Sequence, residues 1–183
     1  MSKPFLLLPA VDISAGSVLR PEQGEIRANS EFGQPAQVVA EFADAGSKWI
    51  HIVDLDLAFK RGNNQKLIAE IIDEFPTTSF QISGGIADQS TLDLARDSGA
   101  RRVNIASQAL QDKAWLASQF SHPEVELSFA LDYFQGRVVA RGTKEDFGEL
   151  PKVLDFLLQA GCRLVSVTDV ERDGMLTGPN LDL

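Results

Sequence analysis

Phe5-Leu6-Leu7-Leu8-Pro9-Ala10-Val11-Asp12 is an unbroken apolar run that ends at a single carboxylate. The run is too short for a helix and lacks the alternation of a strand with one solvated face. It therefore predicts a buried strand with both faces covered. Pro9 cannot donate to a neighbouring strand, so it is tolerated only near a strand's end. Asp12 then lies at the tip of the strand, either as a loop cap or as a group available for chemistry.

The composition around this run is that of an ordinary soluble globular protein. Of the 183 residues, 44% are hydrophobic and 23% are charged, and no apolar run approaches the ~20 residues that span a membrane. Lys and Arg number 17 against 26 Asp and Glu, a net charge of −9 that repels phosphate backbones and anionic lipids. We therefore expect neither nucleic acid nor membrane as a partner. With no recognisable export signal, we expect a cytoplasmic location.

A repeating unit organises the rest of the chain: a short apolar run, a polar or glycine tip, and a helix with the 3.6-residue period. The expected strands after the first cover 49–54, 79–82, 101–105, 127–131 and 164–169. Repeated alternation predicts a single α/β domain with a parallel sheet, and polar tips at successive strand ends favour a (β/α)-barrel. A doubly wound open sheet is the alternative, but no Gly-x-Gly-x-x-Gly follows the first strand.

Two of the tips predict a phosphate site. Ser83, Gly84 and Gly85 follow the third strand, where paired glycines let backbone amides approach an oxyanion closely. Ala106 and Ser107 follow the fourth strand, with the Ser107 hydroxyl in a helix N-cap position. Either tip alone is compatible with an ordinary turn, whereas two neighbouring tips would enclose one phosphate.

Further strand ends carry polar residues. Asp54 closes the second strand, Asp132 follows the fifth, and Thr168 stands near the end of the sixth. A hairpin from Tyr133, with Gln135-Gly136 at its turn, would bring Arg141 close to Asp132. The single cysteine cannot form an internal disulfide. His51, inside the second strand, is interpreted as a core histidine with its hydrogen bonds satisfied.

Several motifs occur in a characteristic order: Leu7-Leu-Pro-Ala-Val-Asp12, Trp49-Ile-His-Ile-Val-Asp-Leu-Asp56, Ala58-Phe-x-Arg61-Gly, Ser83-Gly-Gly-Ile86, Arg102-Val-Asn104 and Asp173-Gly-x-Leu-Thr-Gly-Pro-Asn-Leu181. Together they resemble the HisA/PriA family along the whole chain, and the third and fourth resemble its actinobacterial PriA branch. The resemblance implies a TIM (β/α)8-barrel. It also implies an Amadori rearrangement of an N-linked phosphoribosyl aminoaldose to the aminoketose. The PriA branch serves both histidine and tryptophan biosynthesis with one site.

The resemblance also implies roles for particular residues. Asp12 would be the general base that takes the C2 proton, Asp173 the general acid at the ring oxygen, and Asp132 a supporting carboxylate. Arg20 and Arg141 would position substrate anions, and the two phosphate tips would hold one phosphate. Asp54 and Thr168 complete the candidate substrate-binding set. This chemistry requires no metal or redox cofactor. The expected partners are small phosphoribosyl substrates, and the complete barrel is expected to be a monomer.

One departure from the family concerns substrate choice. The family's Arg-Gly-Trp is Arg141-Gly142-Thr143 here, and threonine has no aromatic face to stack on an aminoimidazole carboxamide. We expect the histidine-pathway activity to be weakened and the phosphoribosylanthranilate activity to be favoured. A HisF-type cyclase is a weaker match, because no lysine stands near the end of the first strand. A TrpF-type enzyme normally has cysteine at the position of Asp12.

The second departure is length. A TIM barrel needs eight strands and ~250 residues, whereas this chain holds about six βα units. We expect units 7 and 8 to be missing from residues 1–183, either because the chain is a fragment, which we favour, or because another chain completes the barrel. A non-catalytic phosphate-binding barrel fragment is therefore an alternative function.

Overall fold

The computed structural model describes residues 5–19, 31–121, 123–140, 145–176 and 178–183. Six parallel strands form the centre of the sheet: β1 (Ala10–Ser14), β4 (Trp49–Asp54), β5 (Ser79–Ser83), β6 (Arg102–Ile105), β7 (Glu126–Phe134) and β10 (Val165–Asp169). Each pairs with the next in this order. The order never reverses among these strands, so the switch point of a doubly wound sheet does not occur. No described pairing joins β1 to β10, and the sheet is open there.

Short antiparallel strands extend the sheet at two places. β2 (Ser17–Leu19) and β3 (Glu31–Gly33) follow β1, while β8 (Arg137–Val139) and β9 (Asp146–Glu149) follow β7. The predicted hairpin at Gln135-Gly136 is confirmed, and both turn residues have the positive φ that such a turn requires, 48° and 86°. The β1–β2 hairpin turns at Ala15 and Gly16, which also have positive φ angles.

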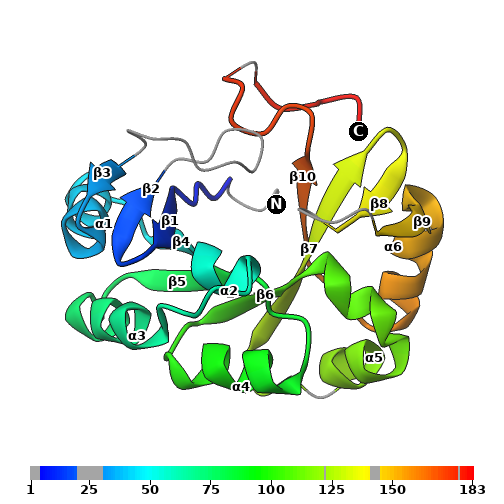
Figure 1. Ribbon diagram of the computed structural model, residues 1–183, viewed down its shortest axis with the longest axis horizontal. Coiled ribbons are helices and arrows are strands. Elements are labelled where there is room, and N and C mark those ends of the chain that lie inside the picture. The colour runs from blue at the N-terminus through cyan, green and yellow to red at the C-terminus, as the bar shows by residue number, and fades with distance from the viewer. Residues whose placement is uncertain (1–4, 20–30, 122, 141–144, 177) are drawn as a thin grey trace.

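The longer helices cover the outer face of the curved sheet (Figure 1). They are α1 (Pro35–Asp44), α3 (Gln65–Glu74), α4 (Gln89–Asp97), α5 (Lys113–Ser121) and α6 (Leu150–Gln159). The short helix α2 (Leu55–Ala58) follows β4 directly and the 3-10 helix η1 (Ser107–Gln111) follows β6, so both begin at the carboxyl ends of strands. Alternation along β4 shows how the core is placed. Ile50 and Ile52 are fully buried and belong to the hydrophobic core, whereas His51 and Val53 line a cavity on the inner face. No described helix is long and apolar enough to cross a membrane.

The first strand differs from its prediction. β1 begins at Ala10 rather than Phe5 and continues beyond Asp12 to Ser14. Phe5 is 93% exposed, whereas Val11 is fully buried, so the expectation that both faces are covered is wrong for the start of the run. Pro9 explains the boundary, because it has no N–H to donate. Only its carbonyl takes part in the sheet, accepting from the His51 amide at 2.9 Å.

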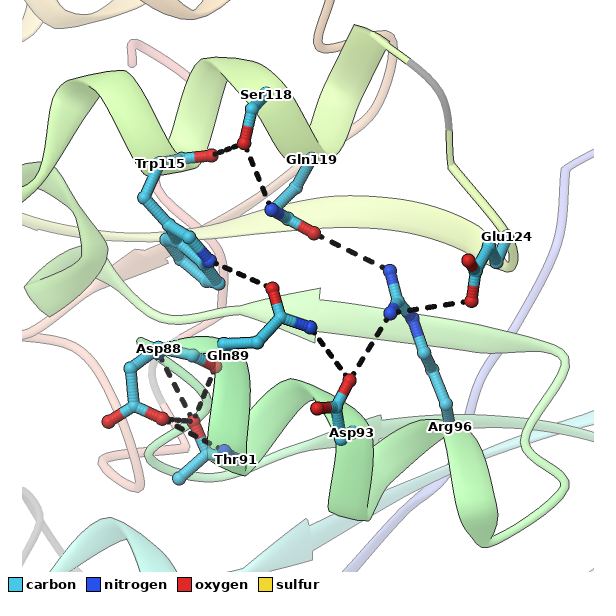
Figure 2. Close-up of polar contacts among 9 residues, drawn as sticks. All are labelled: Asp88, Gln89, Thr91, Asp93, Arg96, Trp115, Ser118, Gln119 and Glu124. Atoms are coloured by element: carbon cyan, nitrogen blue, oxygen red, sulfur yellow. Dashed lines mark hydrogen bonds and ion pairs between the residues drawn. The ribbon is translucent and has the colours of Figure 1, made fainter.

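Polar contacts on the outer face fix α4 against α5, as Figure 2 shows. α4 begins with a capping box in which Asp88 accepts from the Thr91 amide and Thr91 accepts from the Asp88 amide. Two hydrogen bonds join the helices: Trp115 donates to Gln89, and Arg96 donates to Gln119. Within α4, Gln89 and Arg96 both donate to Asp93. Arg96 also forms an ion pair with Glu124. This network holds the start of α4 just beyond the Ser83-Gly84-Gly85 tip.

Candidate active site

A cavity of about 360 Å³ lies at the carboxyl ends of the parallel strands, and all six strands contribute to its lining. This is the edge at which α/β folds place their chemistry. The cavity brings together eight of the residues predicted from the sequence: Asp12, Ser83, Gly84, Gly85, Ala106, Asp132, Thr168 and Asp173. The predicted Arg20, Arg141 and Thr143 lie outside the described residues.

Three carboxylates line this cavity: one lies on the first parallel strand, and two lie on or after the last two. Asp12 stands in β1, and Asp132 in β7 lies opposite Thr168 of β10 in the strand register. Asp173 follows β10 in a turn, where its amide donates to the Asp169 carbonyl at 3.0 Å. All three are half-buried. Several carboxylates around one cavity provide both a proton donor and a proton acceptor for a bound substrate.

Backbone packing fixes the Ser83-Gly84-Gly85 tip. A Cβ at Gly84 would stand 2.2 Å from the Asp54 carbonyl oxygen, and one at Gly85 would stand 2.7 Å from the Leu57 carbonyl oxygen. Their φ angles are +113° and +68°. Only glycine meets both conditions, and both glycines line the cavity. The tip is therefore seated tightly on the end of β4.

The second predicted phosphate tip is built differently. Ala106 lines the cavity, but its amide donates to the Ile86 carbonyl at 2.8 Å. Ser107 is fully buried, and its hydroxyl donates to the Ala130 carbonyl at 2.9 Å. The predicted N-cap role of Ser107 is wrong, because its hydroxyl connects the start of η1 to β7 instead of capping the helix. η1 begins with no side-chain cap.

Asp54 is a scaffold residue in this structure. It does not line the cavity and is only 3% exposed. One oxygen caps α2 by accepting from the Leu57 amide at 3.0 Å, and the other accepts from the Asn64 amide at 2.6 Å. The Asn64 side chain donates at 2.8 Å to the first of these oxygens, the one that caps α2. These bonds occupy the carboxylate, which corrects the substrate-binding prediction for Asp54.

The neighbouring Asp56 clamps the β1–β2 turn. Its carboxylate accepts from the Ser14 hydroxyl and the Ala15 amide, both at 2.7 Å, and from the Asn64 side chain at 3.0 Å. Burial opposes ionisation of Asp56, but these hydrogen bonds and the charge of Arg61 outweigh it and hold its pKa below the ordinary value. The clamp fixes the end of β1, two residues beyond Asp12.

His51 is a cavity residue that the sequence placed in the core. Its Nδ1 lies 2.9 Å from Gln81 Nε2, and its Nε2 lies 3.1 Å from Ser83 Oγ. The histidine is thus satisfied, as expected, and it also lines the cavity. Burial lowers the pKa of His51 to about 4, which keeps the imidazole neutral at neutral pH.

Other cavity residues were missed by the sequence reasoning: Asn104, Gln108 and Ser166. Strand alternation was the available signal for Ser166, because it stands two residues before the predicted Thr168 and shares its face. Asn104 accepts from the Ser128 hydroxyl at 2.9 Å, which fixes its amide. The described residues contain no group of three or more His, Cys, Asp or Glu side chains suited to hold a metal ion.

Comparisons with known proteins identify the family. The profile of the family described as "Histidine biosynthesis protein", a TIM-barrel family, matches residues 6–183. A protein of Bifidobacterium animalis subsp. lactis is 40% identical over 97% of this chain and 74% of its own length. One of Frankia alni is 42% identical over 97% and 72%. One of Cutibacterium acnes is 39% identical over 100% and 71%.

All three relatives have the same name, 1-(5-phosphoribosyl)-5-((5-phosphoribosylamino)methylideneamino) imidazole-4-carboxamide isomerase, or ProFAR isomerase. They are therefore isomerases by name, and their similarity extends over nearly the whole chain. With the family profile covering residues 6–183, the chain belongs to the histidine biosynthesis protein family, as a HisA/PriA-like member.

Proposed function

We propose that this chain catalyses the Amadori rearrangement of an N-linked phosphoribosyl aminoaldose, with ProFAR as its substrate. The observation that carries the proposal is one cavity lined by Asp12, Asp132 and Asp173 and by the glycine tip after β5. The names of the relatives support the choice of ProFAR.

The reaction needs one acid and one base. The carboxylic acid of Asp173 donates a proton to the ribose ring oxygen while the C1–O bond breaks, and the nitrogen lone pair forms C1=N. The Asp12 carboxylate then removes the C2 proton, the C2–H electrons form C1=C2, and the C1=N π electrons return to the nitrogen. The resulting enaminol loses its hydroxyl proton and gains a proton at C1, which leaves the ketone at C2. No net electrons enter or leave, so the two carboxylates suffice.

The backbone amides of the Ser83-Gly84-Gly85 tip and the Ser83 hydroxyl would bind a substrate phosphate. The tight seating of this tip on β4 favours the assignment, because a fixed donor array does not have to be ordered on binding. The predicted contribution of the second tip is smaller than the sequence suggested, since the Ala106 amide and the Ser107 hydroxyl are already engaged.

Turnover of ProFAR by the purified chain tests the proposal. Asp12→Asn and Asp173→Asn are each expected to lower kcat by about 10²- to 10⁴-fold, the range for a lost general acid or base. Asp155→Asn, at an exposed carboxylate on α6, is the matched control and should retain activity. Phosphate binding without turnover of any phosphoribosyl substrate would instead favour the non-catalytic alternative.

Phosphoribosylanthranilate is the second candidate substrate. The observation that favours it is Thr143 in place of the family's tryptophan, two residues after Arg141 in the sequence, an arginine that suits an anthranilate carboxylate. Both substrates are to be assayed in parallel, by anthranilate fluorescence and by absorbance. Thr143→Trp is expected to raise ProFAR turnover relative to anthranilate turnover, and an unchanged ratio would count against this role of Thr143.

A second proposal concerns the complete fold, and it rests on the strand order and on the family. The six parallel strands keep the order of a singly wound barrel, and the family is a TIM-barrel family. We infer that they follow the eight-stranded plan, with two further βα units completing a single-domain, monomeric barrel. Fusing the last quarter of the Cutibacterium acnes relative to this chain should raise turnover and thermal stability together; no gain in either would contradict the inference.

A further inference from the structure

A row of polar side chains crosses the sheet from an exposed carboxylate to the cavity. It begins at Glu126 in β7 and passes through Arg102 in β6 and Gln81 in β5 to His51 in β4. The row ends at Ser83, at the glycine tip. The Arg102 guanidinium donates to Glu126 at 3.1 Å and to the side-chain oxygen of Gln81 at 3.0 Å.

The orientation of Gln81 follows from its contact with Arg102. A guanidinium has only donors, so Gln81 must present its carbonyl oxygen to Arg102 and its NH₂ group to His51. The guanidinium is itself held in place by the Trp49 ring, whose centroid lies 4.3 Å away. Gln81 is 6% exposed, so no bulk water competes for its amide.

This orientation sets the tautomer of His51. Because the Gln81 amide nitrogen donates, Nδ1 of His51 must accept, and the ring proton of the neutral imidazole resides on Nε2. Nε2–H then donates to Ser83 Oγ at 3.1 Å. With its oxygen accepting from the histidine, the Ser83 hydroxyl keeps its own proton available for an acceptor in the cavity, which Ser83 lines.

We propose that Gln81 and His51 are positioning residues that hold the Ser83 hydroxyl as a hydrogen-bond donor toward a phosphate oxygen of the substrate. Neither residue needs to contact the reacting carbons. The identity of the anion rests on the proposed function, whereas the tautomer of His51 does not. The two parts are therefore tested separately.

The tautomer is tested by long-range ¹⁵N–¹H NMR of the full chain at pH 7. The sequence contains only two histidines, so the spectrum of the His122→Gln variant assigns the signals of His51 directly. We expect a neutral ring with the proton on Nε2. In Gln81→Glu, a carboxylate acceptor faces Nδ1, and we expect that nitrogen to become protonated. A wild-type ring that is protonated on Nδ1 would overturn the proposal, whether or not the chain turns over any substrate.

The role of the tautomer is tested by steady-state kinetics on ProFAR. Ser83→Ala and His51→Leu are each expected to raise KM about tenfold, which corresponds to about 1.4 kcal/mol, with kcat changing less than threefold. His51→Gln, whose amide nitrogen can replace Nε2, should recover most of the loss. If His51 acts only through Ser83, the double variant is no worse than Ser83→Ala. Additive losses, or a fall in kcat with KM unchanged, would overturn the proposal.

A second probe separates this inference from the proposed function. Inorganic phosphate is titrated while the backbone amide signals of Gly84 and Gly85 are followed in the wild type and the same variants. Weaker binding in Ser83→Ala and His51→Leu, restored in His51→Gln, supports the positioning role even if neither phosphoribosyl substrate is turned over. Equal phosphate binding by all four proteins, or none by the wild type, would overturn it.

Discussion

Acidification should destabilise the fold through His51. Burial lowers its pKa to about 4 in the folded chain, against about 6.5 when unfolded, so only the unfolded state takes up this proton between these values. The stabilising contribution of the neutral imidazole is complete above pH 6.5 and is lost as the pH falls toward 4. At about 1.36 kcal/mol for each pH unit below 6.5, roughly 2 kcal/mol is lost by pH 5.

Urea unfolding of the wild type and His51→Gln at pH 5, 7 and 8 measures this contribution. Carboxylates titrate alike in both proteins, so the difference between the two unfolding free energies isolates the histidine. That difference should shrink by about 2 kcal/mol from pH 7 to pH 5 and stay constant from pH 7 to pH 8. A difference that is constant across all three values would refute the argument that His51 is neutral because it is buried.

Three further changes test the scaffold by the same unfolding assay. Gly84→Ala should cost about 3 kcal/mol or more, because its Cβ meets a carbonyl at 2.2 Å. Gly46→Ala, with φ +94° and no atom within 4 Å of its Cβ, should cost only the 1–2 kcal/mol of backbone strain; equal costs would contradict the clash. Asp56→Ala should cost about 1.5–3 kcal/mol at pH 7, and less as the pH falls through the lowered pKa of this carboxyl; a loss that does not shrink at all on acidification would argue against the charged clamp. Arg96→Met should cost less than about 1 kcal/mol, since its carboxylate partners are exposed. A larger loss would show that the network between α4 and α5 stabilises the fold by more than exposed ion pairs do.

Periodicity was sufficient to predict most of the fold. Strands such as β4 and β10 and helices such as α3 and α6 follow directly from apolar runs and 3.6-residue stripes. The grouping of the carboxylates was also predictable, because parallel strands deliver their carboxyl ends to one edge of the sheet.

Tertiary contacts decide what the sequence left open. Asp12 and Asp54 both follow an apolar run, yet only Asp12 reaches the cavity, because α2 begins directly after Asp54 and uses its carboxylate as a cap. Ser107 has the sequence position of an N-cap, but its burial leaves the Ala130 carbonyl as its acceptor. Such competition between partners depends on the neighbouring strand, which local sequence does not specify.

The seating of Gly84 on β4 has a consequence for the evolution of this site. When a substitution makes two side chains clash, a smaller side chain at the neighbouring position can remove the clash. Such a second-site change can therefore restore the fold. The atom that blocks a Cβ at Gly84 is a backbone carbonyl oxygen, which every residue at position 54 would carry. No substitution there removes it. Selection for revertants of Gly84→Ala should therefore return true revertants or changes that move the backbone, and never a compensating side chain at position 54.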